Sequence, residues 1–248
     1  MNRRSIRSHC LNAFEFADVI VIGKQDLVSP DHLQRVIGAV KALNPTADIV
    51  CTEHGRVPLA KVLGTGKFNL ERASNMAGWA RELAGLHTPE THTYGIDSFV
   101  LRMREPLHPK RFAAFLQQSF PGLLRAKGYV WLASRPEWAV AYARTGNIAT
   151  IEPVGQWWAA APRDRWPPAG TPERKGLDAT WQEPYGDRIN EVVFIGQAVE
   201  RADVENAFRA CRLTANEIRK GPRHWRNLPD PFPTWVREAV DADAATVA

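Results

Sequence analysis

The feature that most constrains this chain is a short apolar run, Val19 to Ile22, which stops at a glycine and a charged turn. All four residues are β-branched, a composition typical of a strand buried on both faces in a parallel sheet. A Ser-Pro pair at 29 and 30 then marks a helix start, and an Asn-Pro pair at 44 and 45 stops the helix. A second apolar run follows at 49–51. This order predicts two parallel strands joined by a right-handed helical crossover.

The first strand ends in Gly23, Lys24, Gln25 and Asp26, at the carboxyl edge where open α/β sheets bind ligands. A carboxylate at Asp26 can accept the two donors on one edge of guanine as a bidentate pair, while the alkyl stem of Lys24 covers the face of the base. The turn resembles the Asn-Lys-x-Asp motif of P-loop GTPases, with Gly23 in place of Asn. We therefore predict that Lys24 and Asp26 bind guanine, with an affinity reduced by the missing amide.

The pattern changes after a predicted linker at 86–94. Partly alternating or apolar segments predict strands at 96–104, 128–133, 138–144, 148–154 and 188–196, and amphipathic segments predict helices at 106–120 and 200–211. The stretch 162–184 is rich in proline and charge, which predicts a loop. Antiparallel strands with two helices on one face make an α+β layer. The sequence thus predicts an α/β unit followed by an α+β domain.

Composition excludes several functions. The net charge is +5 and looks evenly spread, with no dense Lys/Arg run beyond residues 3–7, so we expect no nucleic-acid partner. The three cysteines are odd in number and lack Cys-x-x-Cys spacing, which indicates a reducing compartment. No apolar run has the length of a membrane helix, and the start has no signal-peptide core. We expect a cytoplasmic protein without a membrane partner.

Histidines are the candidate metal ligands, because imidazole suits zinc. His54 follows the second predicted strand, and His87 and His92 lie five residues apart in a predicted loop. The alternative is that these are surface histidines and that His108 caps a helix. Cys51 falls in a predicted strand, where a thiol is typical of a protein core.

A series of ordered motifs resembles the C-terminal portion of CobW-type GTPases, a family linked to zinc and cobalt handling and to cobalamin synthesis. The resemblance runs from about residue 14 to residue 236. Its motifs include Lys24-x-Asp26, Thr52-Glu53-His54-Gly55, His87-Thr88-Pro89-Glu90-Thr91, Tyr94-Gly95-Ile96, Gly155-Gln156-Trp157-Trp158 and Asp230-Pro231-Phe232-Pro233.

The resemblance implies the remaining C-terminal part of a GTPase domain at 1–90, a CobW C-terminal domain at 94–215 and a tail at 216–248. The family's P-loop, Gly-x-x-x-x-Gly-Lys-Ser/Thr, which cradles the phosphates, has no counterpart in this sequence. Its Cys-x-Cys-Cys metal motif and magnesium-binding Asp are also missing. We therefore expect no GTP hydrolysis by this chain alone, and GTP binding only weakly or with a missing N-terminal half. That half is lost, encoded separately or cut off by a misplaced start.

The resemblance also implies zinc or cobalt as cargo, and a metalloprotein client or a full-length family member as partner. Two alternatives stay open. One is a non-enzymatic interaction module, and the other is a protein that binds zinc directly through histidines. An in-frame P-loop in the DNA upstream of Met1 distinguishes the truncated GTPase from the module. Zinc dialysis at neutral and acidic pH tests histidine ligation, which weakens as imidazole is protonated.

Overall fold

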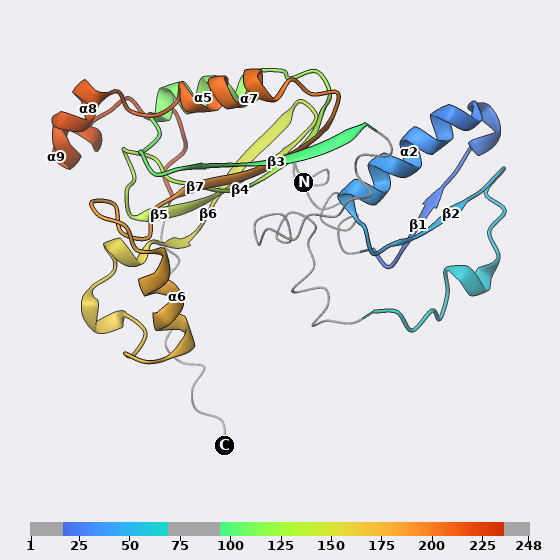
Figure 1. Cartoon of the computed structure of the whole chain (residues 1–248), viewed down its shortest axis with the longest axis horizontal. Helices are drawn as coiled ribbons and strands as arrows, with labels where there is room; N and C mark the ends of the chain where they lie inside the picture. Colours follow the sequence, from blue (N-terminus) through green and yellow to red (C-terminus); the bar gives the residue numbers. More distant parts are fainter. Residues whose placement is uncertain (1–16, 69–94, 236–248) are drawn as a thin grey trace.

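A computed structural model describes residues 17–68 and 95–235 of the chain (Figure 1). Strands β1 (Val19–Ile22) and β2 (Asp48–Cys51) form a two-stranded parallel sheet, and α2 (Pro30–Leu43) connects them. In the register of this sheet, Val19 is opposite Asp48 and Ile22 is opposite Cys51. The predicted strand–helix–strand unit is therefore confirmed, with its parallel pairing.

The ends of α2 are fixed by the residues that predicted them. The Ser29 hydroxyl accepts a hydrogen bond from the His32 N–H (3.3 Å), which caps the helix. At the other end Asn44 is only 2 % exposed. Its side-chain oxygen accepts from the Ala47 N–H (3.0 Å), and its amide donates to the Ala17 carbonyl (2.9 Å). Asn44 thus stops the helix and ties the chain back to the start of β1.

The prediction that β1 is buried on both faces is wrong. Ile20 is 8 % exposed and packs with Val40 and Ala47, whereas Val21 is 44 % exposed. Successive side chains of a strand point to opposite faces of the sheet. Among the described residues, only the face that carries Ile20 is packed against α2, which leaves Val21 on the open face.

The larger sheet has five strands in the order β3-β7-β4-β5-β6, and every pairing is antiparallel. The last strand in sequence therefore lies between β3 and β4. This arrangement confirms the predicted α+β class. The strand bounds are β3 (Ile96–Met103), β4 (Leu123–Val130), β5 (Trp138–Thr145), β6 (Ile148–Gln156) and β7 (Asn190–Gln197).

Two helices, α5 (Pro109–Gln117) and α7 (Arg201–Arg209), lie along one face of this sheet (Figure 1). The core between them is aromatic. Phe112, Phe115 and Phe208 are fully buried, and the rings of Phe112 and Phe115 each meet Phe208 edge-on. Such pairs add to the stabilisation that burial alone provides. The helix predicted at 106–120 therefore turns Phe112 and Phe115 toward the core.

Two expectations about this half are wrong. Strand β4 begins at Leu123, five residues before its predicted start. A charged residue such as Arg125 suggests a surface position, but Arg125 is 5 % exposed and pairs within the sheet. The predicted loop at 162–184 contains η5 (Arg163–Arg165) and α6 (Pro172–Thr180). The Thr171 hydroxyl caps α6 by accepting from the Arg174 N–H (3.2 Å). A Thr-Pro-Glu helix start is thus hidden in a proline-rich segment.

The chain continues into two short helices, α8 (Ala215–Arg219) and α9 (Gly221–Trp225). Thr214 and Glu217 form a capping box at the start of α8. Trp225 at the end of α9 is 6 % exposed and packs with Trp131 and Leu213. None of the helices in 17–68 and 95–235 has the length and hydropathy that crossing a membrane requires.

Candidate functional site

Lys24 and Asp26 lie in the turn that follows β1, where the sequence places them. Lys24 has a left-handed backbone (φ 62°) and precedes η1 (Gln25–Leu27), which contains Asp26. Both side chains are exposed, and neither bonds to another residue within 17–68 or 95–235. Their guanine-binding role stays a prediction, but the carboxylate and the ammonium group are both accessible to a ligand.

The turn after β2 lies against this turn and completes one edge. The Gln25 N–H donates to the Thr52 carbonyl (3.4 Å), and its side-chain amide donates to Glu53 Oε1 (3.3 Å). Thr52 is 3 % exposed, and its hydroxyl donates to the Arg56 carbonyl (2.6 Å). These bonds join the two loops at the carboxyl ends of the strands, the position in which parallel sheets hold ligands.

His54 is exposed at the tip of the second turn, with a left-handed backbone (φ 48°). It is therefore on the same edge as Lys24 and Asp26. The other two predicted ligands, His87 and His92, lie outside the described residues. In the described part of the chain, no group of three or more His, Cys, Asp or Glu residues is placed to hold a metal ion. The predicted histidine ligand set thus stays a prediction.

The described cysteines do not add a metal site. Cys51 is a half-buried free thiol in β2. Cys211 is 2 % exposed, and burial raises the pKa of its thiol to about 12. The thiolate is the form that binds metals. Cys211 is therefore a protonated core residue at neutral pH, and its sulfur lies 3.3 Å from the Ala207 carbonyl.

Helix α2 connects this edge to the larger sheet. It begins directly after the Lys24–Asp26 turn, with Ser29 as its cap. One face of α2 packs on the small sheet, and a second face, formed by Ala39, Ala42 and Leu43, packs against three apolar residues of β3 and β7. These three are Ile96, Val193 and Ile195. A single packed helix thus joins the predicted base-recognition edge to the α+β domain.

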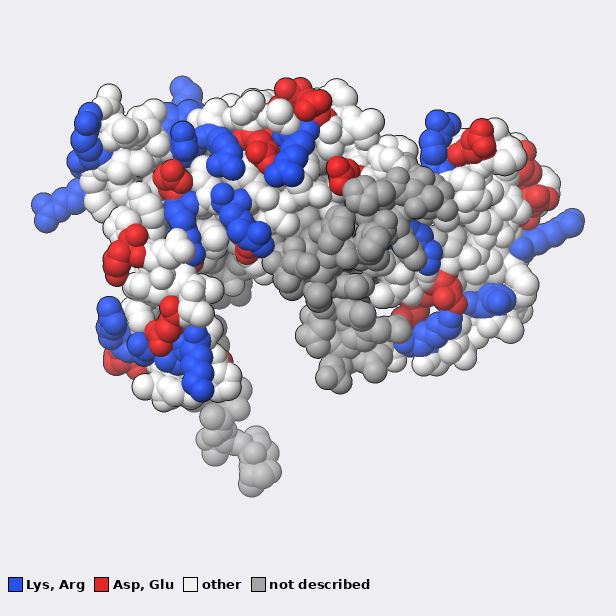
Figure 2. Space-filling model, viewed as in Figure 1, with Lys and Arg blue, Asp and Glu red and all other residues white. Residues whose placement is uncertain are grey.

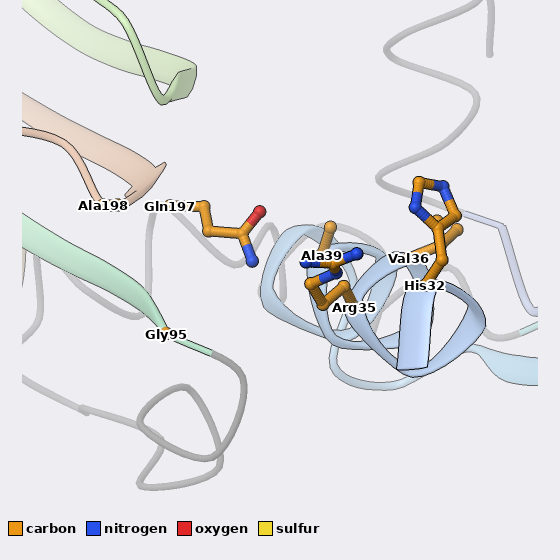
Figure 3. Close-up of a pocket in the computed structure, with 7 residues that line it drawn as sticks. All are labelled: His32, Arg35, Val36, Ala39, Gly95, Gln197 and Ala198. Atoms are coloured by element: carbon orange, nitrogen blue, oxygen red, sulfur yellow. The ribbon is translucent and has the colours of Figure 1, made fainter. Parts of the chain in front are cut away.

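A pocket of about 550 Å³ lies beside this junction. Figure 3 shows Gln197 extending from the end of β7, while His32 and Arg35 come from α2. The lining is mixed, with donors on both sides and small apolar side chains between them. The sequence gives no sign of this pocket, because its residues meet only when α2 docks on the larger sheet. The lining residues are His32, Arg35, Val36, Ala39, Gly95, Gln197 and Ala198.

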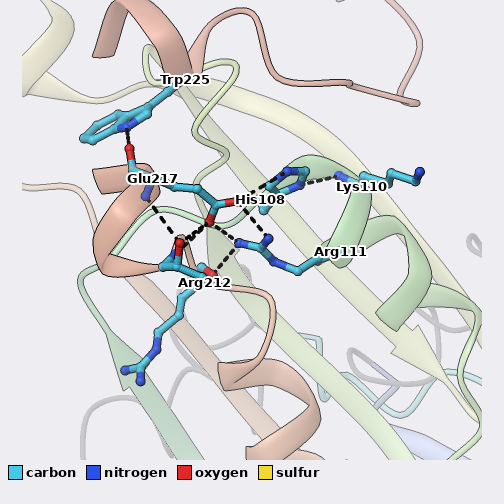
Figure 4. Close-up of polar contacts among 7 residues, drawn as sticks. His108, Lys110, Arg111, Arg212, Glu217 and Trp225 are labelled. Atoms are coloured by element: carbon cyan, nitrogen blue, oxygen red, sulfur yellow. Dashed lines mark hydrogen bonds and ion pairs between the residues drawn. The ribbon is translucent and has the colours of Figure 1, made fainter. Parts of the chain in front are cut away.

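A polar cluster ties α8 to α5 (Figure 4). The Glu217 carboxylate accepts from Arg111 through both oxygens (3.0 and 2.7 Å) and from the Thr214 N–H (2.7 Å). Arg111 also donates to the Arg212 carbonyl (2.7 Å), and the Trp225 indole donates to the Glu217 carbonyl (2.8 Å). Bidentate pairs of this kind are both stronger and more directional than single bonds. The cluster therefore fixes α8 and α9 on the α+β domain.

His108 adjoins the cluster and caps α5, as the sequence predicts. Its Nδ1 accepts from the Lys110 N–H (3.2 Å), and its Nε2 lies 4.0 Å from Glu217 Oε1. Burial, together with the nearby Arg111 charge, lowers the pKa of His108. The imidazole is therefore neutral at pH 7 and acts as an acceptor.

The Glu217 carboxylate makes the anchoring of α8 dependent on pH. Hydrogen bonding from Arg111 lowers the pKa of Glu217 to about 2. A depressed pKa stabilises the fold above the unfolded pKa, and this contribution is lost as the pH falls through about 4.5 to about 2. We expect Glu217→Gln to reduce the free energy of unfolding by up to about 3 kcal/mol at pH 7. Urea titrations should show that difference shrink toward pH 2, and a pH-independent difference would contradict the account.

The fold and the edge define a class of protein. A parallel strand–helix–strand unit, whose first strand ends in the Lys24–Asp26 turn, precedes a five-stranded antiparallel sheet with two helices on one face. Residues 96–212 match the family described as the cobalamin synthesis protein cobW C-terminal domain. The chain thus contains the C-terminal domain of the CobW family, which confirms the resemblance and the predicted fold class.

Curated relatives extend over most of this chain. It is 36 % identical over 235 residues to the zinc-regulated GTPase metalloprotein activator 1 of Dictyostelium discoideum. The aligned segment covers 93 % of this chain and 49 % of that protein. It is 27 % identical over 233 residues to a zinc chaperone of Mycobacterium tuberculosis. The aligned segment covers 94 % of this chain and 55 % of that protein. This chain therefore spans about half the length of the curated relatives it matches.

Solved structures show a more distant similarity. The zinc-bound YjiA GTPase of E. coli is 18 % identical, with a TM-score of 0.38, over 85 % of this chain and 57 % of that one. This similarity is too low to assign a role to any residue of the site.

Proposed function

We propose that this chain acts in zinc delivery to metalloproteins. In this role the turn at Lys24 and Asp26 recognises the guanine base of GTP, and the CobW C-terminal domain contacts the metal or the client. The observation that carries the proposal is a pair of exposed, unengaged side chains at the carboxyl end of a parallel strand. The relative named as a zinc-regulated GTPase metalloprotein activator supports the choice of cargo and client.

The chemistry of base recognition follows from the side chains at this edge. The Asp26 carboxylate accepts from the N1–H and N2–H₂ groups of guanine, which adenine does not present in that pattern. The Lys24 alkyl stem lies over the base. Gly23 leaves no amide to brace the loop, so binding of the base alone is weak.

These 248 residues contain no P-loop sequence, and we propose that they do not hydrolyse GTP by themselves. Phosphoryl transfer depends almost entirely on positioning and charge stabilisation around the phosphates. In this proposal the turn at Lys24 and Asp26 contacts the base and not the phosphates, so it supplies neither the positioning nor the charge stabilisation. The zinc ligands we propose are His54, His87 and His92, with zinc as cargo rather than as a catalytic ion.

A titration with nucleosides tests base recognition without phosphates. We expect guanosine to shift the backbone amide signals of residues 23–27 in two-dimensional ¹H–¹⁵N spectra, and adenosine to leave them in place. Asp26→Asn should abolish the shifts because it removes one of the two acceptors. Asp31→Asn, an equal change of charge at an exposed position of α2, should retain them. Equal shifts with adenosine, or none with guanosine, would overturn the proposal.

A further inference from the structure

The excess positive charge of this chain is concentrated in one segment. Residues 206–228 contain six Lys and Arg residues and a single carboxylate, so they carry a net charge of +5 at pH 7. This equals the net charge of the whole chain, which means that the remaining residues are balanced. The even spread of charge predicted from the sequence is therefore wrong here. The six cations are Arg209, Arg212, Arg219, Lys220, Arg223 and Arg226.

All six side chains are exposed, and two of them pair with acidic residues. Arg212 lies 3.6 Å from Glu105, and Arg226 lies 3.1 Å from Glu137. The other four make no ion pair with any residue in the described ranges. Arg209 ends α7, whereas Arg219, Lys220 and Arg223 lie in α8, in α9 or between them, and we name these three the α8–α9 basic surface.

The single carboxylate of the segment does not neutralise this surface. Glu217 is held by the bidentate bonds from Arg111 of α5, and this pairing lowers its pKa to about 2. Its negative charge is thus matched by a cation from outside the segment. The charges of the α8–α9 basic surface therefore remain uncompensated at neutral pH.

The surface is also rigidly supported. The Thr214–Glu217 capping box starts α8, and the buried Trp225 indole ties α9 to α8 through the Glu217 carbonyl (2.8 Å). Trp225 packs in turn on Trp131 of the larger domain. Figure 2 shows Lys and Arg side chains projecting from the end of the molecule where Figure 1 places α8 and α9. A fixed base reduces the entropy lost when such a surface binds a partner.

We propose that the α8–α9 basic surface docks an acidic polypeptide segment of a partner protein. Two of its three cations are arginines, whose planar guanidinium groups bind carboxylates in a bidentate manner. Complementary charge of this kind accelerates association and selects among partners. The proposal does not depend on zinc or nucleotide binding.

The observations favour an acidic protein over the two other anionic partners. A nucleic-acid surface combines cations with exposed aromatic platforms or a helix long enough to enter a groove. Here Trp225 is buried, and α8 and α9 have five residues each. A membrane-binding helix presents an apolar face. None of the exposed large hydrophobic residues in the described ranges lies between 201 and 235.

Fluorescence anisotropy with a labelled oligoglutamate peptide tests the proposal on the full chain. We expect binding that weakens with salt, and a loss of affinity of about tenfold in Arg219→Glu/Arg223→Glu. The matched control, Arg165→Glu/Lys175→Glu, makes the same change of net charge at exposed positions of η5 and α6, and its affinity should stay within about twofold. Arg219→Gln/Arg223→Gln, which introduces no repulsion, should lose about threefold.

Several results would overturn the proposal. Equal losses in the reversal variant and its control would show that net charge, and not this surface, attracts the peptide. Tighter binding of duplex DNA or of phosphatidylserine vesicles than of oligoglutamate at the same salt would assign the surface to another class of partner. Absence of peptide binding would also overturn it, given circular dichroism spectra that confirm folded protein in every sample.

Discussion

Arg144→Met is expected to reduce the free energy of unfolding by about 3–5 kcal/mol, among the largest effects available in this chain. Arg144 is 1 % exposed, and its guanidinium is surrounded by acceptors. Nε donates to the Tyr142 hydroxyl (2.9 Å), and Nη1 donates to the Gln118 carbonyl (2.9 Å). Nη2 donates to the carbonyls of Phe115 (3.1 Å) and Leu116 (3.0 Å).

The position of these acceptors explains the size of the effect. The three carbonyls lie at the C-terminal end of α5, where helical carbonyls have no partner within the helix and the helix dipole is negative. Removing the guanidinium takes away its bonds to the Leu116 and Gln118 carbonyls and leaves the Phe115 carbonyl with the Gln118 N–H as donor (3.1 Å). Burial also raises the pKa of Tyr142 to about 12, so its hydroxyl stays protonated and serves as acceptor to Arg144. Lysine should restore only part of the stability, because it lacks the planar fork.

Urea unfolding followed by tryptophan fluorescence measures the Arg144 effect. The control is Arg102→Met on β3, whose side chain is 51 % exposed and pairs with Glu191. Exposed pairs contribute about 1 kcal/mol or less, so the control should unfold close to the unmodified protein. If Arg144→Met also lies within about 1 kcal/mol of that protein, the buried guanidinium is not what holds the end of α5.

Gly128→Ala is expected to destabilise the protein by about 3 kcal/mol. Gly128 lies within β4, and a Cβ atom there would be 2.0 Å from the Glu191 carbonyl oxygen and 2.7 Å from the Val192 Cα. Both contacts are with the backbone of β7, so a side chain cannot rotate away to relieve them. The two central strands must move apart, which weakens the pairing that builds the sheet.

A thermal melt compares Gly128→Ala with a matched glycine. Gly155 lies in β6, where an added Cβ would meet nothing within 4 Å. We expect Gly128→Ala to lower the midpoint by about 10 °C and Gly155→Ala to leave it nearly unchanged. Similar midpoints for the two variants would show that β4 and β7 are not in close contact at Gly128.

Local signals account for the parts of the fold that the sequence predicts. Ser29, Pro30 and Asn44 fix the ends of α2 through their own hydrogen bonds or ring geometry, so the bounds of this helix agree with the pattern. The Lys24–Asp26 turn likewise follows directly from the end of β1. The position of β7 between β3 and β4 has no such signal, because strand order depends on pairing between distant segments.

The remaining errors have the same origin. Arg125 suggests a solvated position, but tertiary packing buries it at 5 % exposure. Glu217 and Arg111 are 106 residues apart, so their bidentate pair cannot be inferred from spacing. The pocket beside α2 and the α8–α9 basic surface likewise arise only when separate elements meet. The sequence places the Lys24–Asp26 turn at the end of β1 because that turn is local, and its guanine-binding role stays a prediction. The sequence patterns predict neither the pocket nor the α8–α9 basic surface.

The most direct test of the central claim is GTP hydrolysis by these 248 residues in the presence of magnesium. We propose a base-recognition edge without the loop that holds the phosphates. We expect phosphate release at the rate of the buffer blank, both for the unmodified chain and for Asp26→Ala. Magnesium-dependent release above that rate, lost in Asp26→Ala, would contradict it.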